Sequence, residues 1–225
     1  MRRIAMLVPV VAIGFATPAL AGPRETLTEA AFATPDKAAA LQKINAAEAQ
    51  ARAVLARNPQ DRDAQMYRAI AIGYRAKLAR SRADAQTAKR MFELLAQADP
   101  RDPEPQILIG GWHLDAIEDL GGMIAGAVLG AKRATGLAAV DRAVALGRNR
   151  AMFPALAALM RVRLDAKDTA TAAALAEQAT RTAAPTQIDR ILQQHAAAIL
   201  PLLRAGNGAA AQKMARRLLP FGKLG

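Results

Sequence analysis

The sequence predicts an all-α protein in which about nine helices pair antiparallel and stack as an α-solenoid. One spacing pattern recurs: a large residue, a helix-facing residue at +3, a small one at +4 and a large one at +7, which is typical of interlocking helix pairs. The pattern occurs in the segments 67–74, 107–114, 153–160 and 192–199. Asp-Pro and Asn-Pro pairs separate the helical stretches, and no stretch reads convincingly as a strand.

Start and stop signals place the first four helices at about residues 35–57, 61–80, 81–99 and 102–120. Thr34-Pro35-Asp36 puts a proline at the first helical position, and Asn58-Pro59 stops that helix. Asp61, Ser81 and Asp102 are expected to cap the next three helices, because their side-chain oxygens can accept backbone N–H groups. Short turns between these helices favour antiparallel neighbours.

The remaining helices are expected after a glycine-rich passage, at about residues 135–147 and 152–166, from Asp168 onward, and at 186–204 and 208–220. Leu146-Gly147 and Gly206-Asn207-Gly208 provide the glycines that commonly end helices. Pro201 is expected to bend the eighth helix. Residues 35–220 are therefore predicted to form one helical repeat domain, with the apolar insertion 121–131 inside it.

Residues 1–21 resemble an export signal. Arg2 and Arg3 precede a mostly apolar stretch at 4–15, and Ala19-Leu20-Ala21 is the small-x-small pattern that predicts cleavage before Gly22. A membrane anchor is the alternative, but the stretch is shorter than the roughly 20 residues that a spanning helix needs. The sequence thus predicts an exported, periplasmic protein, soluble after cleavage, with an extended segment at 22–34.

Composition disfavours most enzyme classes. The chain has no cysteine and two histidines, which rules out thiol catalysis and a histidine-rich metal site. No Gly-x-Ser-x-Gly elbow, Gly-Lys-Ser/Thr phosphate loop or dinucleotide fingerprint is present. We therefore expect no catalytic residue, no metal and no cofactor.

Charge is arranged in blocks on a chain of formal net charge +12. Residues 52–90 carry ten basic and three acidic side chains, residues 91–120 carry one basic and seven acidic, and the segment 121–164 is basic again. Four interpretations are open: solvated helix faces, alignment of neighbouring repeats, attraction to an acidic partner, and peripheral contact with an anionic membrane surface. Nucleic acid is not expected, because an exported chain with 4% aromatic residues lacks stacking platforms.

The helix pairs resemble tetratricopeptide repeats. Ala88, Phe92 and Pro100 match three of four small, bulky, small and proline positions of that family's second helix, and Leu95 is too large for the remaining one. Another copy reads Gly136, Val140 and Ala143, with Arg148 in place of the proline. The resemblance covers roughly residues 41–219 and implies a right-handed stack whose concave face binds peptides or proteins. A weaker resemblance, through the glycine-rich apolar centre, is to the helical-repeat component of tripartite dicarboxylate transporters.

The least ordinary stretch is the apolar insertion 121–131, in which glycine recurs every four residues at 122, 126 and 130. On a helix this spacing leaves backbone uncovered on one face. Close packing of helices, the wall of a lipid-like or small-molecule pocket, and a membrane or partner contact are all compatible with it. Trp112, the only tryptophan, could be a pocket floor or a wedge between repeats.

Together these observations predict a non-enzymatic scaffold or adaptor that binds a protein or peptide. The alternative is a ligand-binding accessory of an envelope transport system, with an apolar or anionic small molecule in a cavity lined by the glycine-rich segment. The candidate binding surface comprises Tyr67, Tyr74, Arg75, Lys77, Trp112, His113, Gly122, Gly126 and Gly130.

Overall fold

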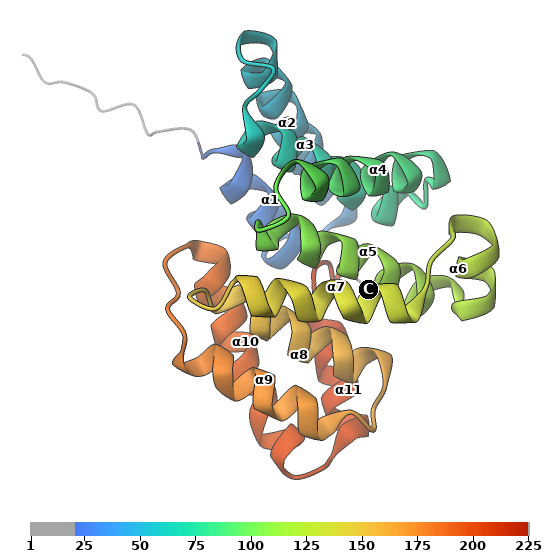
Figure 1. The fold of residues 1–225 in the computed structure, drawn as a ribbon, viewed down its shortest axis with the longest axis vertical. Helices are drawn as coiled ribbons and strands as arrows, with labels where there is room; N and C mark the ends of the chain where they lie inside the picture. The colour runs from blue at the N-terminus through green and yellow to red at the C-terminus, as the bar shows by residue number, and fades with distance from the viewer. Residues whose placement is uncertain (1–20, 225) are drawn as a thin grey trace, which may run out of the picture.

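The computed structural model describes residues 21–224, which form an all-helical protein without a strand in that range (Figure 1). Its helices are α1 Pro23–Phe32, α2 Lys37–Arg57, α3 Arg62–Ala79, α4 Arg82–Ala98, α5 Pro103–Leu120, α6 Gly122–Leu129, α7 Arg133–Leu146, α8 Met152–Leu164, α9 Thr169–Arg181, α10 Gln187–Arg204 and α11 Gly208–Leu218. The all-α prediction is confirmed. The export signal lies outside the described residues, apart from Ala21.

Three predicted caps are confirmed, whereas Asp168, also expected to cap a helix, makes no side-chain capping bond at α9. The carboxylate of Asp61 accepts the backbone N–H of Ala64 at 2.9 Å, and Ser81 and Asp102 cap α4 and α5 in the same way. Thr186 and Asp189 form a reciprocal capping box at α10. The start of α2 differs from the expectation, because Asp36 is its cap and the helix begins two residues after Pro35.

Helices that follow one another in the chain pack against one another, so that α2, α3 and α4 lie side by side, as do α8, α9 and α10. The pair α5 and α7 packs together across the middle of the molecule (Figure 1). The short α6 connects them in the chain. Gly110 on α5 allows this close approach, since a Cβ there would lie 2.5 Å from Cγ2 of Val140 on α7. In this copy of the recurring pattern, the helix-facing position at +3 therefore lies in a helix contact.

Two helices were not among the nine expected. The segment 22–34, predicted to be extended, instead contains α1, because Pro23 can occupy the first helical turn and Leu27, Ala30, Ala31 and Phe32 form an apolar face that is buried on the core. The insertion 121–131 contains α6. The described residues thus hold eleven helices rather than nine.

The C-terminal residues 219–224 return to the start of the structure. The backbone N–H of Phe221 donates to the carbonyl of Ala31 at 2.7 Å, and its ring meets the Tyr74 ring edge-on at 4.9 Å between centroids. Leu219 and Phe221 are buried. This segment ends near the middle of the molecule in Figure 1 and joins α1 and α3 to the last helices.

Within residues 21–224 no single helix is long and apolar enough to cross a membrane. Only α6 and α7 taken together reach that length and composition, and they do so across a bend of 86°.

Candidate functional site

A small hollow lies where both halves of the chain meet. Its volume is about 60 Å³, and helices α1, α3, α5, α8 and α10 contribute to its lining. The lining residues are Arg24, Leu27, Thr28, Tyr67, Ile70, Tyr74, Glu104, Arg150, Met152 and Ile188. We call this feature the five-helix hollow. Its wall is largely apolar, with two guanidinium groups and one carboxylate at its rim.

Two arginines share one carboxylate at this rim. Arg150 Nη1 donates to Oε1 of Glu104 at 2.6 Å, and Nη2 of Arg24 lies 3.6 Å from the same oxygen. Arg24 Nε also donates to the hydroxyl oxygen of Tyr67 at 2.5 Å. The side chains of Arg24, Glu104 and Arg150 keep 28%, 17% and 19% of their surface exposed. These three charged side chains are therefore mostly buried and keep a minor part of their surface in contact with solvent.

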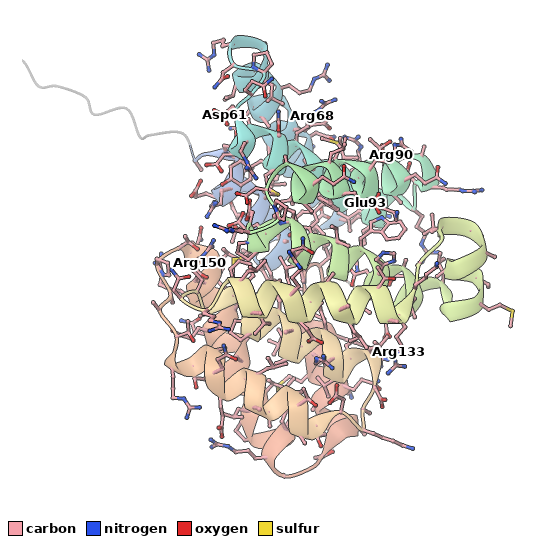
Figure 2. The ribbon with its side chains drawn as sticks, viewed as in Figure 1. Asp61, Arg68, Arg90, Glu93, Arg133 and Arg150 are labelled. Atoms are coloured by element: carbon pink, nitrogen blue, oxygen red, sulfur yellow. The ribbon has the colours of Figure 1, made fainter. Side chains whose placement is uncertain are left out.

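Asp189 fixes Arg150 in this position. Its carboxylate is fully buried and accepts the Nε–H of Arg150 at 3.2 Å, the backbone N–H of Met152 at 3.2 Å and the hydroxyl of Thr186 at 2.6 Å. A buried carboxylate with this many donors is held in one orientation. Asp189 thereby anchors Arg150, which Figure 2 labels close to α10, while Nη1 of Arg150 donates to Glu104.

The electrostatics of the hollow suit binding better than proton transfer. Burial raises the pKa of the Tyr67 phenol, and the bond from Arg24 only partly opposes this effect. Burial opposes the charge of Arg24, but Glu104 and Tyr67 outweigh it and raise the pKa of the guanidinium. Tyr67 therefore stays neutral and Arg24 charged at neutral pH, and neither can exchange a proton near pH 7 as a general acid or base does.

The hollow contains two of the residues predicted from sequence, Tyr67 and Tyr74. Burial raises the pKa of the Tyr74 phenol well above its usual range, so it too is neutral. Two other predicted residues lie elsewhere and are used internally. Arg75 pairs with Glu48 and Asp84, and Lys77 Nζ lies 2.9 Å from Oδ2 of Asp115. Their charges form ion pairs between helices.

Trp112 and His113 also serve packing. The indole N–H of Trp112 donates to the carbonyl of Ala85 at 2.8 Å, and the ammonium of Lys89 lies 5.7 Å from the ring centroid. His113 is buried and its Nδ1 accepts the backbone N–H of Lys132 at 3.1 Å. Burial lowers the pKa of His113, so the imidazole is neutral at neutral pH. Neither side chain lines the five-helix hollow.

The three glycines of the apolar insertion are not packed against another helix. Nothing lies within 4 Å of a Cβ built on Gly122 or Gly130, and for Gly126 the nearest atom is the carbonyl oxygen of Ala131 at 3.6 Å. Gly130 is the left-handed cap that ends α6. Met123 and Ile124 are 88% and 56% exposed. Here α6 presents an outward apolar surface rather than a close helix contact or the wall of a pocket.

Sequence reasoning did not identify Arg24, Glu104, Arg150 or Asp189 as site residues. Thr186 and Asp189 carried a readable signal, since their spacing is that of a capping box. Arg24 lay in a segment expected to be extended, and the contact of Glu104 with Arg150 spans 46 residues. No local spacing reports such a contact.

In the part of the chain that the structure describes, no group of three or more His, Cys, Asp or Glu side chains is placed to hold a metal ion. Comparison with family models, with curated proteins and with solved structures finds no match for this chain.

Proposed function

We propose that this chain is an exported helical scaffold of the tetratricopeptide type that holds a segment of a protein or peptide partner. The observation that carries the proposal is the five-helix hollow, where Arg24 and Arg150 converge on one carboxylate beside an apolar wall. The consecutive packing of the helices supports the repeat architecture, because each pair shields its apolar face on the next. In our proposal the stack is an α-solenoid that binds its partner and catalyses no reaction.

The size of the hollow favours a peptide side chain over a small-molecule ligand. Small-molecule sites usually measure about 300–1,000 Å³, and this hollow measures about 60 Å³. A space of this size holds one side chain or a few water molecules. The transport-accessory alternative also required a cavity beside the glycine-rich segment, where Met123 and Ile124 instead face solvent. Both observations favour the peptide-binding scaffold over the transport accessory.

The chemistry of the rim defines the partner. An apolar side chain would enter between Leu27 and Ile70, and a neighbouring carboxylate of the peptide would take the place of Glu104 on Arg24. Guanidinium groups bind carboxylates in a directional way, with two parallel donors. We infer that the partner segment carries an acidic residue, or its free C-terminal carboxylate, next to an apolar residue.

The test starts with a display library of random peptides with free C-termini, selected on the chain that begins at Gly22. The dissociation constant of the selected peptide is then measured by fluorescence anisotropy. Arg24→Gln removes one guanidinium and is expected to weaken binding at least tenfold. Glu104→Gln removes the competing carboxylate and is expected to strengthen binding. The two opposite signs distinguish a binding site from general destabilisation, which would weaken binding in both variants.

Arg101→Gln is the matched control, because Arg101 is exposed in the α4–α5 turn and does not line the hollow. Its affinity should equal that of the unmodified chain. Higher salt should reduce the affinity of the unmodified chain more than that of Arg24→Gln. Selection of no peptide, or of peptides that bind equally well to Arg24→Gln, would contradict the proposal.

A further inference from the structure

Helix α6 carries the main exposed apolar surface in the described part of the chain. Within the described residues, five large apolar side chains are exposed. Four of them lie at 120–128: Leu120 at 41%, Met123 at 88%, Ile124 at 56% and Val128 at 36%. The fifth, Leu94, stands alone on α4 at 63%. Single exposed apolar residues are ordinary, whereas a contiguous exposed group marks an interaction surface.

The geometry presents this group outward. Helix α6 lies at the edge of the molecule, beyond the stacked helices (Figure 1), and meets α7 at 86°. Gly121 and Gly130, both at positive φ, set its two ends. The segment 120–131 contains no charged side chain. An eight-residue helix is about 12 Å long, so α6 can enter only the outer layer of a bilayer.

Positive charge borders this apolar surface. Lys132 and Arg133 follow two residues after α6 and are exposed, and Figure 2 shows Arg133 at the end of α7 next to α6. The preceding acidic residues are already in ion pairs, Glu118 with Arg216 at 2.9 Å and Asp119 with Lys77 at 3.7 Å. Arg133 itself contacts Asp165 at 3.3 Å, but both side chains are about half exposed, so this pair is easily exchanged. The chain as a whole is strongly basic.

A second copy of the chain is a poor occupant for α6. A stable protein interface buries about 800 Å² on each partner. A helix about 12 Å long and 10 Å wide presents on the order of 120 Å². A bilayer surface needs no such area or shape complementarity, because apolar side chains enter the interfacial region individually and basic residues meet the anionic head groups.

We propose that α6 and the end of α5 form a membrane-contact element, which inserts Leu120, Met123, Ile124 and Val128 into the interfacial layer of an anionic phospholipid bilayer. Lys132 and Arg133 lie at head-group level in this arrangement. The helix lies in the surface and does not cross it. This role is independent of the five-helix hollow, which remains open on another part of the molecule.

Binding to vesicles tests the proposal. The chain from Gly22 is used, because the apolar stretch at 4–15 would itself bind lipid and every described helix lies after it. Partition coefficients are measured by co-sedimentation with vesicles of phosphatidylcholine containing phosphatidylglycerol, and with phosphatidylcholine alone. The double variant Met123→Ser with Ile124→Ser should lose at least tenfold in partitioning, since two large apolar side chains no longer leave water. Leu94→Ser, the matched control on α4, should stay within twofold.

A charge variant and a site-specific probe complete the test. Lys132→Gln should reduce partitioning into the anionic vesicles about fivefold. Its partitioning into phosphatidylcholine vesicles should change little. Because the chain has no cysteine, Met123→Cys and Leu94→Cys can each be labelled at one site with an environment-sensitive fluorophore. The label at 123 should shift to the blue on vesicle binding, and the label at 94 should not.

Three outcomes would overturn the proposal. One is that the chain binds neither the anionic vesicles nor the phosphatidylcholine vesicles. Another is binding that the double variant leaves unchanged, which would indicate adsorption by net charge alone. The third is a concentration-dependent dimer, detected by light scattering, that the double variant abolishes, which would assign α6 to self-association. None of these outcomes bears on peptide binding in the hollow.

Discussion

Asp115→Asn should destabilise the protein more than any change to a surface carboxylate. Oδ1 of Asp115 lies 2.5 Å from Nη2 of Arg163 and its Oδ2 lies 2.9 Å from Nζ of Lys77. Arg163 is 5% exposed, so its guanidinium has little access to water. Removing one partner of a buried pair typically costs 3–5 kcal/mol, because the other charge stays buried and uncompensated.

The structure places Asp115→Asn near the lower end of that range. The side chain of Asp115 keeps 32% of its surface exposed, so water partly screens the pair. We expect a loss of about 3 kcal/mol in the free energy of unfolding, which for a chain of this size lowers the melting temperature by roughly 6–12 °C. Urea unfolding followed by circular dichroism at 222 nm measures the first quantity and a thermal scan the second.

The same pair makes stability depend on pH. Burial alone would raise the pKa of Asp115, but the charges of Arg163 and Lys77 outweigh it and hold this pKa well below its usual range. The unfolded chain, with a carboxyl pKa of about 3.9, therefore takes up a proton before the folded chain does. The stabilisation is complete above about pH 5 and is lost progressively as the pH falls below about 4. The difference between the unmodified chain and Asp115→Asn should accordingly narrow in acid.

Asp119→Asn is the control for this prediction, because Asp119 is on the same helix, approaches the same Lys77 at 3.7 Å and has 51% of its side chain exposed. An exposed pair contributes about 0–1 kcal/mol. Equal losses in the two variants, or a loss below about 1 kcal/mol for Asp115→Asn, would refute the assignment of this pair as a buried structural contact.

Two further changes test the packing. Phe221→Ala should lower the free energy of unfolding by about 3 kcal/mol, because it removes a buried ring that meets Tyr74 edge-on; a urea midpoint like that of the unmodified chain would show that the C-terminal segment is not held. Gly110→Ala should cost about 1–3 kcal/mol, since its Cβ would lie 2.5 Å from Val140, whereas Gly126→Ala should stabilise by up to about 1 kcal/mol through helix propensity. The same sign for both glycine variants in calorimetry would contradict the packing described for α6.

Helix positions could be predicted because their signals are local. A capping side chain acts within three residues, so Asp61, Ser81 and Asp102 revealed their helices without knowledge of the fold. Gly110, the helix-facing position of the recurring pattern, does lie in a helix contact, since a Cβ there would meet Val140 at 2.5 Å. The helix α1 was missed because its signal, Pro23 followed by an apolar face, directly follows the expected cleavage site.

The candidate site was harder to predict because its residues meet only in the folded chain. Arg24 lies 43 residues from Tyr67, and Arg150 lies 39 residues from Asp189. Conversely, the basic run that includes Arg75 and Lys77 suggested a binding face. Each of these two side chains forms an ion pair with an acidic residue on another helix. A charge pattern records composition and does not show which charges neutralise one another.

The contact of residues 219–224 with α1 affects the order in which the chain can fold during synthesis. Ala31 is synthesised 190 residues before Phe221, whose backbone N–H donates to the Ala31 carbonyl. During synthesis the α1 surface that this segment covers stays open. An open repeat array can unravel from its ends one repeat at a time. In this chain residues 219–224 bind α1, so these two segments are expected to come apart together, and proteolytic loss of residues 219–224 would loosen α1 as well.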